Sequence, residues 1–292
     1  MLKRLGLVRR HLDLEIERVS RRKELPMNIL ETVFATYPGG VDLTLQDFVY
    51  SLSTDNPAFG VTLATTLITF FLGFMVYVYS VLLVNREGAG PYPVWMHTFY
   101  CAADFMGIWV FLSAYNAVGG FWFFMLGCVG EAVWVLVEIY CLYKTVVVER
   151  FEMWGPDCTA GHAIFVICAQ ILVFFVSLNF LRVELGDVSM FKFWIFTQVI
   201  IVCAPGMFWR ERKTRVGACW QLVITLVLVC VMSFNPWGNM WSLISPYFSI
   251  ENNPWYYVMG AGVLLFAIYD VVVYAKLPKK PEKLLNGKKP LF

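Results

Sequence analysis

Long apolar stretches alternate with short polar segments along almost the whole chain. Each stretch has about 20 residues, which as a helix is enough to cross the roughly 30 Å hydrocarbon core of a bilayer. The strands of a transmembrane barrel are only about 10 residues long and alternate in polarity, a pattern that this chain lacks. The sequence therefore predicts an all-α fold, a seven-transmembrane-helix bundle, with helices at residues 58–84, 93–116, 119–143, 161–183, 189–209, 216–234 and 255–275.

The composition favours a membrane protein over a soluble one. Hydrophobic residues make up 59% of the 292-residue chain and charged residues only 15%, whereas a soluble domain carries about 25% charged residues. The formal net charge of +2 is too small to indicate a nucleic-acid partner. The eight cysteines contain no Cys-x-x-Cys pair, so neither a disulfide framework nor a zinc site is expected. No cofactor is predicted.

Three regions of different character are predicted. Residues 1–57 form an N-terminal amphipathic helix and a polar connector, residues 58–275 the membrane domain, and residues 276–292 a basic, flexible tail. Within residues 1–24, apolar side chains recur at helical spacing among Arg and Lys, as in a helix that lies on a lipid surface or docks on a partner. A solvated, partly frayed tail is the alternative for this segment.

The distribution of Lys and Arg indicates how the helices are oriented. Most of these residues near the predicted helix ends lie in the loops after the third and fifth helices and in the C-terminal tail. The positive-inside rule places the C-terminus in the cytosol of a multi-pass protein of the endoplasmic reticulum or a bacterial plasma membrane. The amphiphilic loop 235–254, on the opposite side, is either a lid over the membrane surface or an ordinary interfacial loop.

Four carboxylates interrupt the apolar segments: Asp104, Glu131, Glu138 and Asp270. A charged side chain in hydrocarbon costs about 3 kcal/mol or more, so such residues usually face a protein interior and mark a functional site. The short turn between the second and third helices predicts a hairpin that brings Asp104 and Glu131 to the same depth. Glu138 shares a helix face with Glu131, and Asp270 lies close in depth to Glu138.

Carboxyl groups that meet away from water suit acid chemistry. Desolvation and a neighbouring carboxylate both favour the protonated form, which then serves as a general acid at neutral pH. The alternative is that each carboxylate only clasps two helices through a hydrogen bond. A metal site built from the same residues with His97 and His162 is disfavoured, because the Glu-x-x-His spacing of di-metal bundles is absent.

Aromatic residues crowd the second and third predicted helices. Trp109, Tyr115 and Trp134 are candidate substrate-binding residues, together with His97 near the start of the second helix. Aromatic faces stabilise cations through their quadrupole, so a pocket lined by these rings would hold an apolar substrate and a developing positive charge. The alternative is aromatic bulk that faces the lipid.

Several segments of the chain resemble one known family. They are the end of the first helix into the second (VYSVLLVNREGAGPYPVWMHTFYCAADFMGIWVF), the third helix (GFWFFMLGCVGEAVWVLVEIYCLYK), TRVGACWQL and IYDVVVYAK. In these segments the chain is similar to the integral-membrane terpene cyclases of meroterpenoid and indole-diterpene pathways. The resemblance implies an early acid at Asp104 and a late acid at Asp270 that protonate an epoxide or alkene. The chain departs from the family at Ala103-Asp104-Phe105, where an aromatic-Glu pair is usual, and Glu131 is a competing donor by its depth.

The sequence therefore predicts a membrane-embedded terpene cyclase that protonates an apolar, prenylated small molecule and guides ring closure of the carbocation. The lipid bilayer and this substrate are the expected partners, with no nucleic acid. Two alternatives stay open. One is a proton-coupled small-molecule transporter, which intramembrane carboxylates also serve, and the other is a non-catalytic receptor or subunit of a membrane complex.

Overall fold

The regular structure in the described part of the chain is entirely helical. The computed structural model describes residues 41–284 and 287–291, so the amphipathic helix predicted within residues 1–24 lies outside the described residues. From Val41 onward the chain forms one compact unit. Its helices are α3 (Leu45–Ser51), α4 (Phe59–Glu87), α5 (Val94–Ala117), α6 (Trp122–Lys144), η1 (Thr145–Glu149), α7 (Arg150–Trp154), α8 (Ala160–Glu184), α9 (Phe191–Cys203), α10 (Pro205–Arg212), α11 (Trp220–Phe234), α12 (Met240–Ile244), η2 (Pro246–Phe248) and α13 (Pro254–Lys276).

Six helical segments among the described residues are long and apolar enough to cross a membrane, which confirms the all-α, multi-pass prediction. They match the predicted spans within a few residues, except that the third continues to Trp154 and the fifth is the pair α9–α10. The predicted span 216–234 contains α11, an apolar helix of 15 residues. At 1.5 Å per residue α11 is about 22 Å long, shorter than a hydrocarbon core of about 30 Å. Among the described residues, length and composition therefore support six spans, and the predicted seventh is not confirmed.

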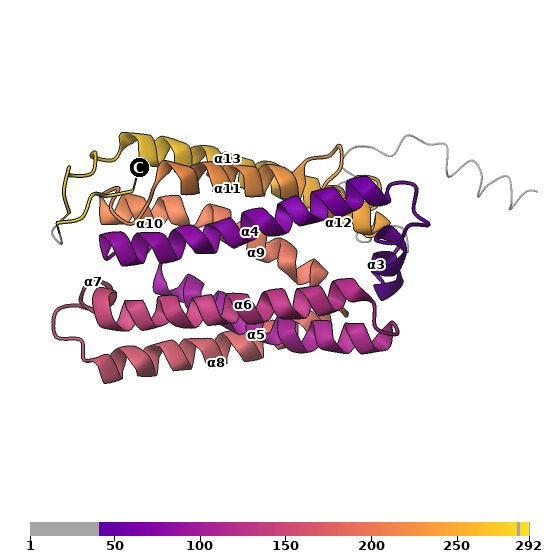
Figure 1. Cartoon of the computed structure of the whole chain (residues 1–292), viewed down its shortest axis with the longest axis horizontal. Helices are drawn as coiled ribbons and strands as arrows, with labels where there is room; N and C mark the ends of the chain where they lie inside the picture. The colour runs from indigo at the N-terminus through magenta and orange to yellow at the C-terminus, as the bar shows by residue number, and fades with distance from the viewer. Residues whose placement is uncertain (1–40, 285–286, 292) are drawn as a thin grey trace, which may run out of the picture. The chain divides into compact units, whose positions relative to one another are not determined.

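The helices from Val41 onward pack in two groups (Figure 1). In one group α5 packs against both α6 and α8, and in the other α11 packs on α4, α9 and α13. Because α4 also contacts α6, it joins the two groups. The interior between them is therefore lined by α4, α5, α6, α9 and α11.

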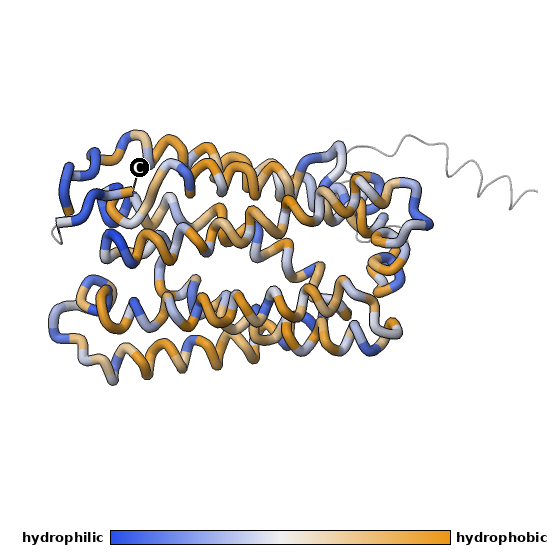
Figure 2. Tube along the Cα trace, viewed as in Figure 1, coloured by the Kyte–Doolittle hydropathy of each residue, from blue (hydrophilic) through white to orange (hydrophobic). Residues whose placement is uncertain are grey.

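The burial of the helices shows which of them are suited to face lipid. Only 11% of the residues in the most apolar 18-residue stretch of α8 are buried. Phe165, Leu172 and Phe180 on this helix are more than half exposed. Soluble monomers rarely expose a continuous apolar surface of this kind. Figure 2 shows the apolar residues along the helices and polar residues gathered at their ends. In contrast, 67% of the residues in the corresponding stretch of α5 are buried, so α5 supplies side chains to the interior.

Two helices are interrupted at places that the hydropathy pattern did not predict. Between α9 and α10, Pro205 has no backbone N–H to continue the helix and its ring clashes with the preceding turn, so the axis breaks. After α6, the π-helical turn η1 leads directly into α7. The predicted third helix ended at residue 143, because charged residues follow, whereas helical geometry continues to Trp154.

Residues 41–57, predicted to be a polar connector, contain a helix that packs on the membrane helices. A capping box starts α3, and the Phe48 ring is fully buried against aromatic rings of α6 and α9. The loop 235–254 folds onto the same helix, because the Ser245 hydroxyl donates a 2.6 Å hydrogen bond to Asp47. This loop therefore closes one end of the described helices.

The C-terminal tail, predicted to be flexible, folds back on the end of α4. Lys280 forms a 2.6 Å ion pair with Glu87, and the two side chains are 7% and 0% exposed. The backbone N–H of Leu291 also donates to the Glu87 carboxylate, at 2.7 Å. A buried carboxylate at the end of α4 therefore anchors the described part of the tail.

Candidate functional site

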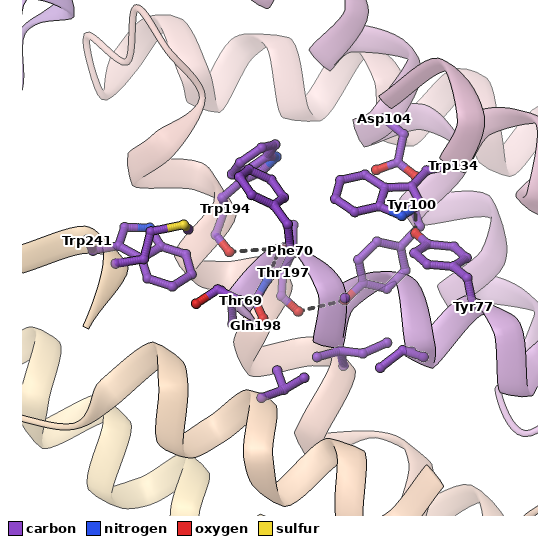
Figure 3. A pocket seen from close by; sticks show the side chains of 15 residues that line it. Thr69, Phe70, Tyr77, Tyr100, Asp104, Trp134, Trp194, Thr197, Gln198 and Trp241 are labelled. Atoms are coloured by element: carbon purple, nitrogen blue, oxygen red, sulfur yellow. Dashed lines mark hydrogen bonds between the residues drawn. The ribbon is translucent and has the colours of Figure 1, made fainter. Parts of the chain in front are cut away.

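A cavity lies where α5 and α9 meet α4 and α6. Its volume is ≈ 70 Å³, enough for a few water molecules or for one end of a larger ligand. The wall is largely aromatic, and Asp104 is the one acidic residue among those that line it. The lining residues converge in Figure 3 and are Thr69, Phe70, Gly73, Val76, Tyr77, Tyr100, Asp104, Trp134, Trp194, Thr197, Gln198, Ile201, Val229, Met240 and Trp241.

The carboxyl group of Asp104 meets one neighbour from α4 and one from α6. Asp104 lies on α5 and is only 5% exposed. The Tyr77 hydroxyl of α4 donates a hydrogen bond to Asp104 Oδ2 at 3.1 Å. The Glu131 carboxyl group of α6 lies near Asp104, and no hydrogen bond to its oxygens is found among the described residues. Two buried carboxyl groups this near one another disfavour the doubly ionised state.

The position of Glu131 depends on a glycine in the neighbouring helix. Glu131 is fully buried, and no N–H or hydroxyl group among the described residues donates to its oxygens. A Cβ atom on Gly107 of α5 would lie 2.8 Å from Glu131 Cδ. Because residue 107 is a glycine, the Glu131 carboxyl group can lie against α5. The hairpin of α5 and α6 brings Asp104 and Glu131 to the same depth, as its short turn predicts.

A histidine–carboxyl pair lies on the same two helices. His97 Nδ1 of α5 and Glu138 Oε2 of α6 are 2.6 Å apart, and both side chains are at most 5% exposed. The Tyr77 hydroxyl, which donates to Asp104, also lies near Glu138. Glu131, Asp104, Tyr77, Glu138 and His97 thus form a buried cluster of proton-carrying groups, in which hydrogen bonds join Tyr77 to Asp104 and His97 to Glu138. We call this cluster the acid chain.

The acid chain has few positive charges to balance its carboxyl groups. Among the ion pairs of the described residues, His97 is the one cationic partner that reaches it. Carboxyl groups that face one another in a low-dielectric interior share protons, because two adjacent negative charges are unfavourable there. No group of three His, Cys, Asp or Glu side chains in the described part of the chain is arranged to hold a metal ion. The arrangement is therefore suited to donating and passing protons.

Aromatic rings form the other side of the cavity. The Trp134 indole lies beside the acid (Figure 3) and stacks on the Tyr77 ring, with centroids 5.8 Å apart and planes at 21°. Trp194 of α9 meets Trp134 nearly edge-on at 6.4 Å. The Tyr100 hydroxyl donates to the Thr197 carbonyl at 2.6 Å, which fixes the orientation of this ring. A cation formed beside the acid would therefore lie close to π-faces held in place by their neighbours.

Asp270, the fourth intramembrane carboxylate, lies elsewhere. It is fully buried but does not line the cavity, and no described hydrogen bond or ion pair joins it to the acid chain. It packs on the first turn of α10, where a side chain on Gly206 would collide with the Asp270 carboxyl group. The first turn of a helix presents free N–H groups and the positive end of the helix dipole. Asp270 therefore lies at the α9–α10 break and not with the other three intramembrane carboxylates.

Three of the four predicted substrate-binding residues do not line the cavity. Trp109 is 57% exposed, because five residues of helix turn it well away from the face that carries Asp104. Tyr115 packs over Gly120 in the turn of the hairpin. The His97 ring is bonded to the Glu138 carboxyl group and does not face the cavity. Trp134 is the candidate that the structure places at the cavity.

The cavity also contains residues that the sequence analysis did not single out: Tyr77, Tyr100, Trp194, Gln198 and Trp241. A weak signal existed for some of them. A tyrosine in the middle of the first apolar segment and the polar pair Thr197-Gln198 in the fifth require polar partners in a membrane interior. Trp241 carried no such signal, since it lies in a loop and reaches the cavity only because its indole N–H bonds to the Phe191 carbonyl.

Comparisons of this chain with protein-family models, with curated proteins and with solved structures give no match. The chemistry of the site is therefore inferred from its own residues. They combine a buried acid, a chain of groups that can pass it protons and an aromatic wall, within helices suited to lipid.

Proposed function

We propose that the protein is a membrane-embedded cyclase that protonates an epoxide or alkene of a prenylated substrate and guides ring closure of the resulting carbocation. One observation carries this proposal: the buried carboxyl group of Asp104, hydrogen-bonded to Tyr77, opens on a cavity walled by aromatic rings. The resemblance of the chain to integral-membrane terpene cyclases points the same way. The apolar surroundings suit a substrate that reaches the site from the bilayer.

In the proposed reaction Asp104 is the general acid. Its proton adds to the epoxide oxygen, the C–O bond at the more substituted carbon breaks, and the electron pair stays on oxygen as a hydroxyl group. For an alkene, the proton adds to carbon and leaves a tertiary cation. A second double bond then attacks the cation and closes a ring, and loss of a proton from carbon ends the sequence. The product is an isomer of the substrate, so no oxidant or reductant is consumed.

The aromatic wall supports the second half of this reaction. Trp134 and Trp194 offer π-faces to the cation, and each such contact is worth about 0.5–2 kcal/mol depending on desolvation. A dry cavity also prevents water from quenching the cation before the ring closes. The site thus offers a proton donor at one end and an electron-rich aromatic surface beside it.

The size of the cavity bears on how a substrate fits. Pockets for drug-sized ligands measure about 300–1,000 Å³, whereas this cavity measures ≈ 70 Å³. It accommodates the reacting end of a prenyl chain, and the remainder requires movement of wall side chains. Trp241 is suited to such a movement because it belongs to the short helix α12 in a loop and not to a long helix.

The acid chain supports repeated turnover. The step that forms the cation leaves Asp104 without its proton, and the acid must be recharged before the next substrate binds. Tyr77 is hydrogen-bonded to Asp104 and lies near Glu138, which is the partner of His97. We assign Glu138 and His97 the role of passing a proton to Asp104, so neither residue touches the substrate in this mechanism.

The proposal is tested with the substitution Asp104→Asn in membranes that contain the full-length protein. Prenylated aromatic compounds with a terminal epoxide, and the corresponding alkenes, serve as probes in D₂O, and isomers of unchanged formula are separated by chromatography. A general acid contributes about 10²–10⁴-fold to the rate, so the turnover rate of the variant should fall by at least about 100-fold. Asp157→Asn, at an exposed acid outside the cavity, is the matched control.

The deuterium content of the product separates the two modes of initiation. Protonation of an alkene leaves deuterium on carbon, whereas protonation of an epoxide leaves it on an exchangeable hydroxyl group. If Asp104→Asn retains activity and Glu131→Gln loses it, Glu131 is the donor. If the wild-type protein isomerises none of the probes while it binds them, the cyclase proposal is wrong.

Proton-coupled transport is the second candidate, and the acid chain is the observation that favours it. A series of carboxyl, phenol and imidazole groups across three helices is also how a carrier moves protons. Proteoliposomes that contain a pH-sensitive dye distinguish the two functions. A carrier gives a dye response and leaves the added compound unchanged, whereas a cyclase gives an isomer.

We also propose that α11 completes a seventh crossing, with the C-terminus in the cytosol. Two ring contacts support this arrangement: Trp220 at the start of α11 meets Tyr274 near the end of α13, and Phe234 at its end meets Tyr256 near the start of α13. α11 therefore runs antiparallel to a helix long enough to span. The basic loops and tail make the positive-inside rule favour a cytosolic C-terminus.

A further inference from the structure

A second pocket lies between the start of α11, the end of α13 and the C-terminal tail. Its volume is ≈ 480 Å³, several times that of the cavity at Asp104. No residue that lines it belongs to the acid chain or to the aromatic wall. The lining residues are Arg215, Trp220, Tyr274, Lys279, Lys280, Pro281, Glu282, Lys289, Pro290 and Leu291.

Positive charge dominates this pocket. Four of its lining residues are cationic and only Glu282 is acidic. Lys280 is already neutralised by its buried ion pair with Glu87. For Lys279 and Lys289, no ion pair with another described residue is found, and both are exposed. The pocket therefore has an excess of cations, and no ion pair of Arg215, Lys279 or Lys289 is found among the described residues.

Arg215 is held in place by two contacts. Its Nη2 donates to the Ala275 carbonyl at 2.6 Å, and its guanidinium lies 4.9 Å from the centre of the Tyr274 ring. These two contacts hold the guanidinium plane in one orientation. Its Nε is buried and has no hydrogen-bond partner among the described residues. A buried donor without a partner is unfavourable, so this nitrogen indicates an acceptor that a ligand would supply.

The wall beside the cations is apolar and aromatic. The Trp220 and Tyr274 rings meet edge-on with centroids 4.8 Å apart, and Pro281 and Pro290 lie on the tail opposite them. A ligand for this pocket thus has an anionic group next to an apolar body. Guanidinium and ammonium groups together recognise phosphate, Arg through its planar fork and Lys as a point charge.

We propose that this pocket binds the phosphate group of an amphiphile, held between Arg215 on the bundle and Lys279 and Lys289 on the tail. Two sources share this chemistry, the headgroup of an anionic bilayer lipid and a soluble phosphate ester. Because the cations come from two separate segments, the ligand would also fasten the tail to the bundle.

The test uses the full-length protein with the double substitution Lys279→Gln/Lys289→Gln. The matched control is Lys213→Gln/Lys276→Gln, which removes two basic residues outside the pocket. The probes are nanodiscs of phosphatidylcholine with or without phosphatidic acid, and inorganic pyrophosphate added to protein in detergent. The readouts are lipids retained in native mass spectrometry and the shift of the thermal unfolding midpoint.

Near a membrane surface each basic residue contributes about 1 kcal/mol to the binding of anionic lipid, so the pocket variant should bind phosphatidic acid at least tenfold more weakly than the control. A response to phosphatidic acid alone identifies the lipid headgroup as the ligand. A response to pyrophosphate as well, again lost in the pocket variant, identifies a soluble phosphate ester. Equal binding of both probes by the pocket variant and the control would overturn the proposal.

Discussion

The contact between Glu131 and Gly107 shows how one residue without a side chain allows an acid to enter a helix interface. A Cβ at residue 107 would lie 2.8 Å from the carboxyl carbon. We expect Gly107→Ala to lower the free energy of unfolding by about 1–3 kcal/mol, the usual result of overpacking. Thermal unfolding in detergent measures the change.

A double-mutant cycle separates this contact from a general effect of Ala on the helix. With Glu131→Ala the clash is removed, so Gly107→Ala should cost little in that background, and the coupling energy should fall at about 0.5–3 kcal/mol. Equal destabilisation in both backgrounds would mean that Glu131 does not lie against Gly107.

The ion pair between His97 and Glu138 is buried on both sides, which makes it sensitive to the loss of one partner. His97→Phe leaves the carboxylate buried without its cation, and we expect a loss of about 3–5 kcal/mol in unfolding free energy. The double variant His97→Phe/Glu138→Leu replaces the pair by apolar groups and should recover most of that stability.

The same double variant also tests the role of the pair in turnover. If Glu138 and His97 pass protons to Asp104, a stable double variant should still bind the substrate with similar affinity and turn it over more slowly. A double variant with wild-type turnover would limit the pair to a structural role. Unfolding midpoints and a comparison of kcat with KM provide both measurements.

At the scale of helices, the segment before α4 is tied to α9 by an ion pair. Lys192 Nζ lies 2.7 Å from Asp42 Oδ1, and the side chains are 10% and 57% exposed. The hydrogen bond from Lys192 lowers the pKa of Asp42 below its usual value of 3.8. At a pH above 3.8, a lowered carboxyl pKa stabilises the folded state. This stabilisation is lost as the pH falls through the lowered pKa.

The pair is partly solvated, so we expect Asp42→Asn to cost only about 0.2–1 kcal/mol at pH 6. At a pH below the lowered pKa, the variant and the wild type should unfold at the same temperature. Asp55→Asn, an exposed acid in the following turn, is the control. A difference between Asp42→Asn and the wild type that does not change with pH would contradict the assignment.

Docking of the C-terminal tail depends on the end of α4. Glu87 accepts hydrogen bonds from Lys280, the Leu291 N–H and the Gly217 N–H. Glu87→Ala removes all three and should release the tail, so that trypsin cleaves after Lys279 and Lys283 at least tenfold faster. Glu282→Ala, on the tail itself, leaves these bonds intact and serves as the control. Equal cleavage of both variants would show that Glu87 is not the anchor.

For the whole molecule, the number of crossings is the property that length and composition leave open. If α11 crosses the membrane, residues on either side of it face opposite compartments. We expect a cysteine at Glu211 to be labelled by a membrane-impermeant maleimide only after permeabilisation, and one at Trp237, which is 93% exposed, in intact cells. Labelling of both from the same side would leave α11 out of the count of crossings.

Much of the architecture could be predicted from the sequence because hydropathy is a property of the residues themselves. Most of the apolar helices lie within a few residues of their predicted bounds, since their ends are set by where charged and turn-forming residues begin; the exceptions are the third, which continues to Trp154, and the fifth, which is divided at Pro205. The pairing of Asp104 with Glu131 was also predictable, because a short turn fixes the register of two antiparallel helices. The breaks at Pro205 and at η1 were missed, since composition averages over such local features.

The sequence by itself determined that the chain forms membrane helices and that carboxylates lie within them. Only the tertiary structure decided how each helix is rotated about its axis and which neighbour covers each face. That rotation turns Trp109 outward and Trp134 into the cavity. It directs the Tyr77 hydroxyl to Asp104. It also directs Asp270 to the helix break at Gly206. In a membrane, hydropathy no longer distinguishes a lipid-facing side from a protein-facing one, so packing alone makes this choice.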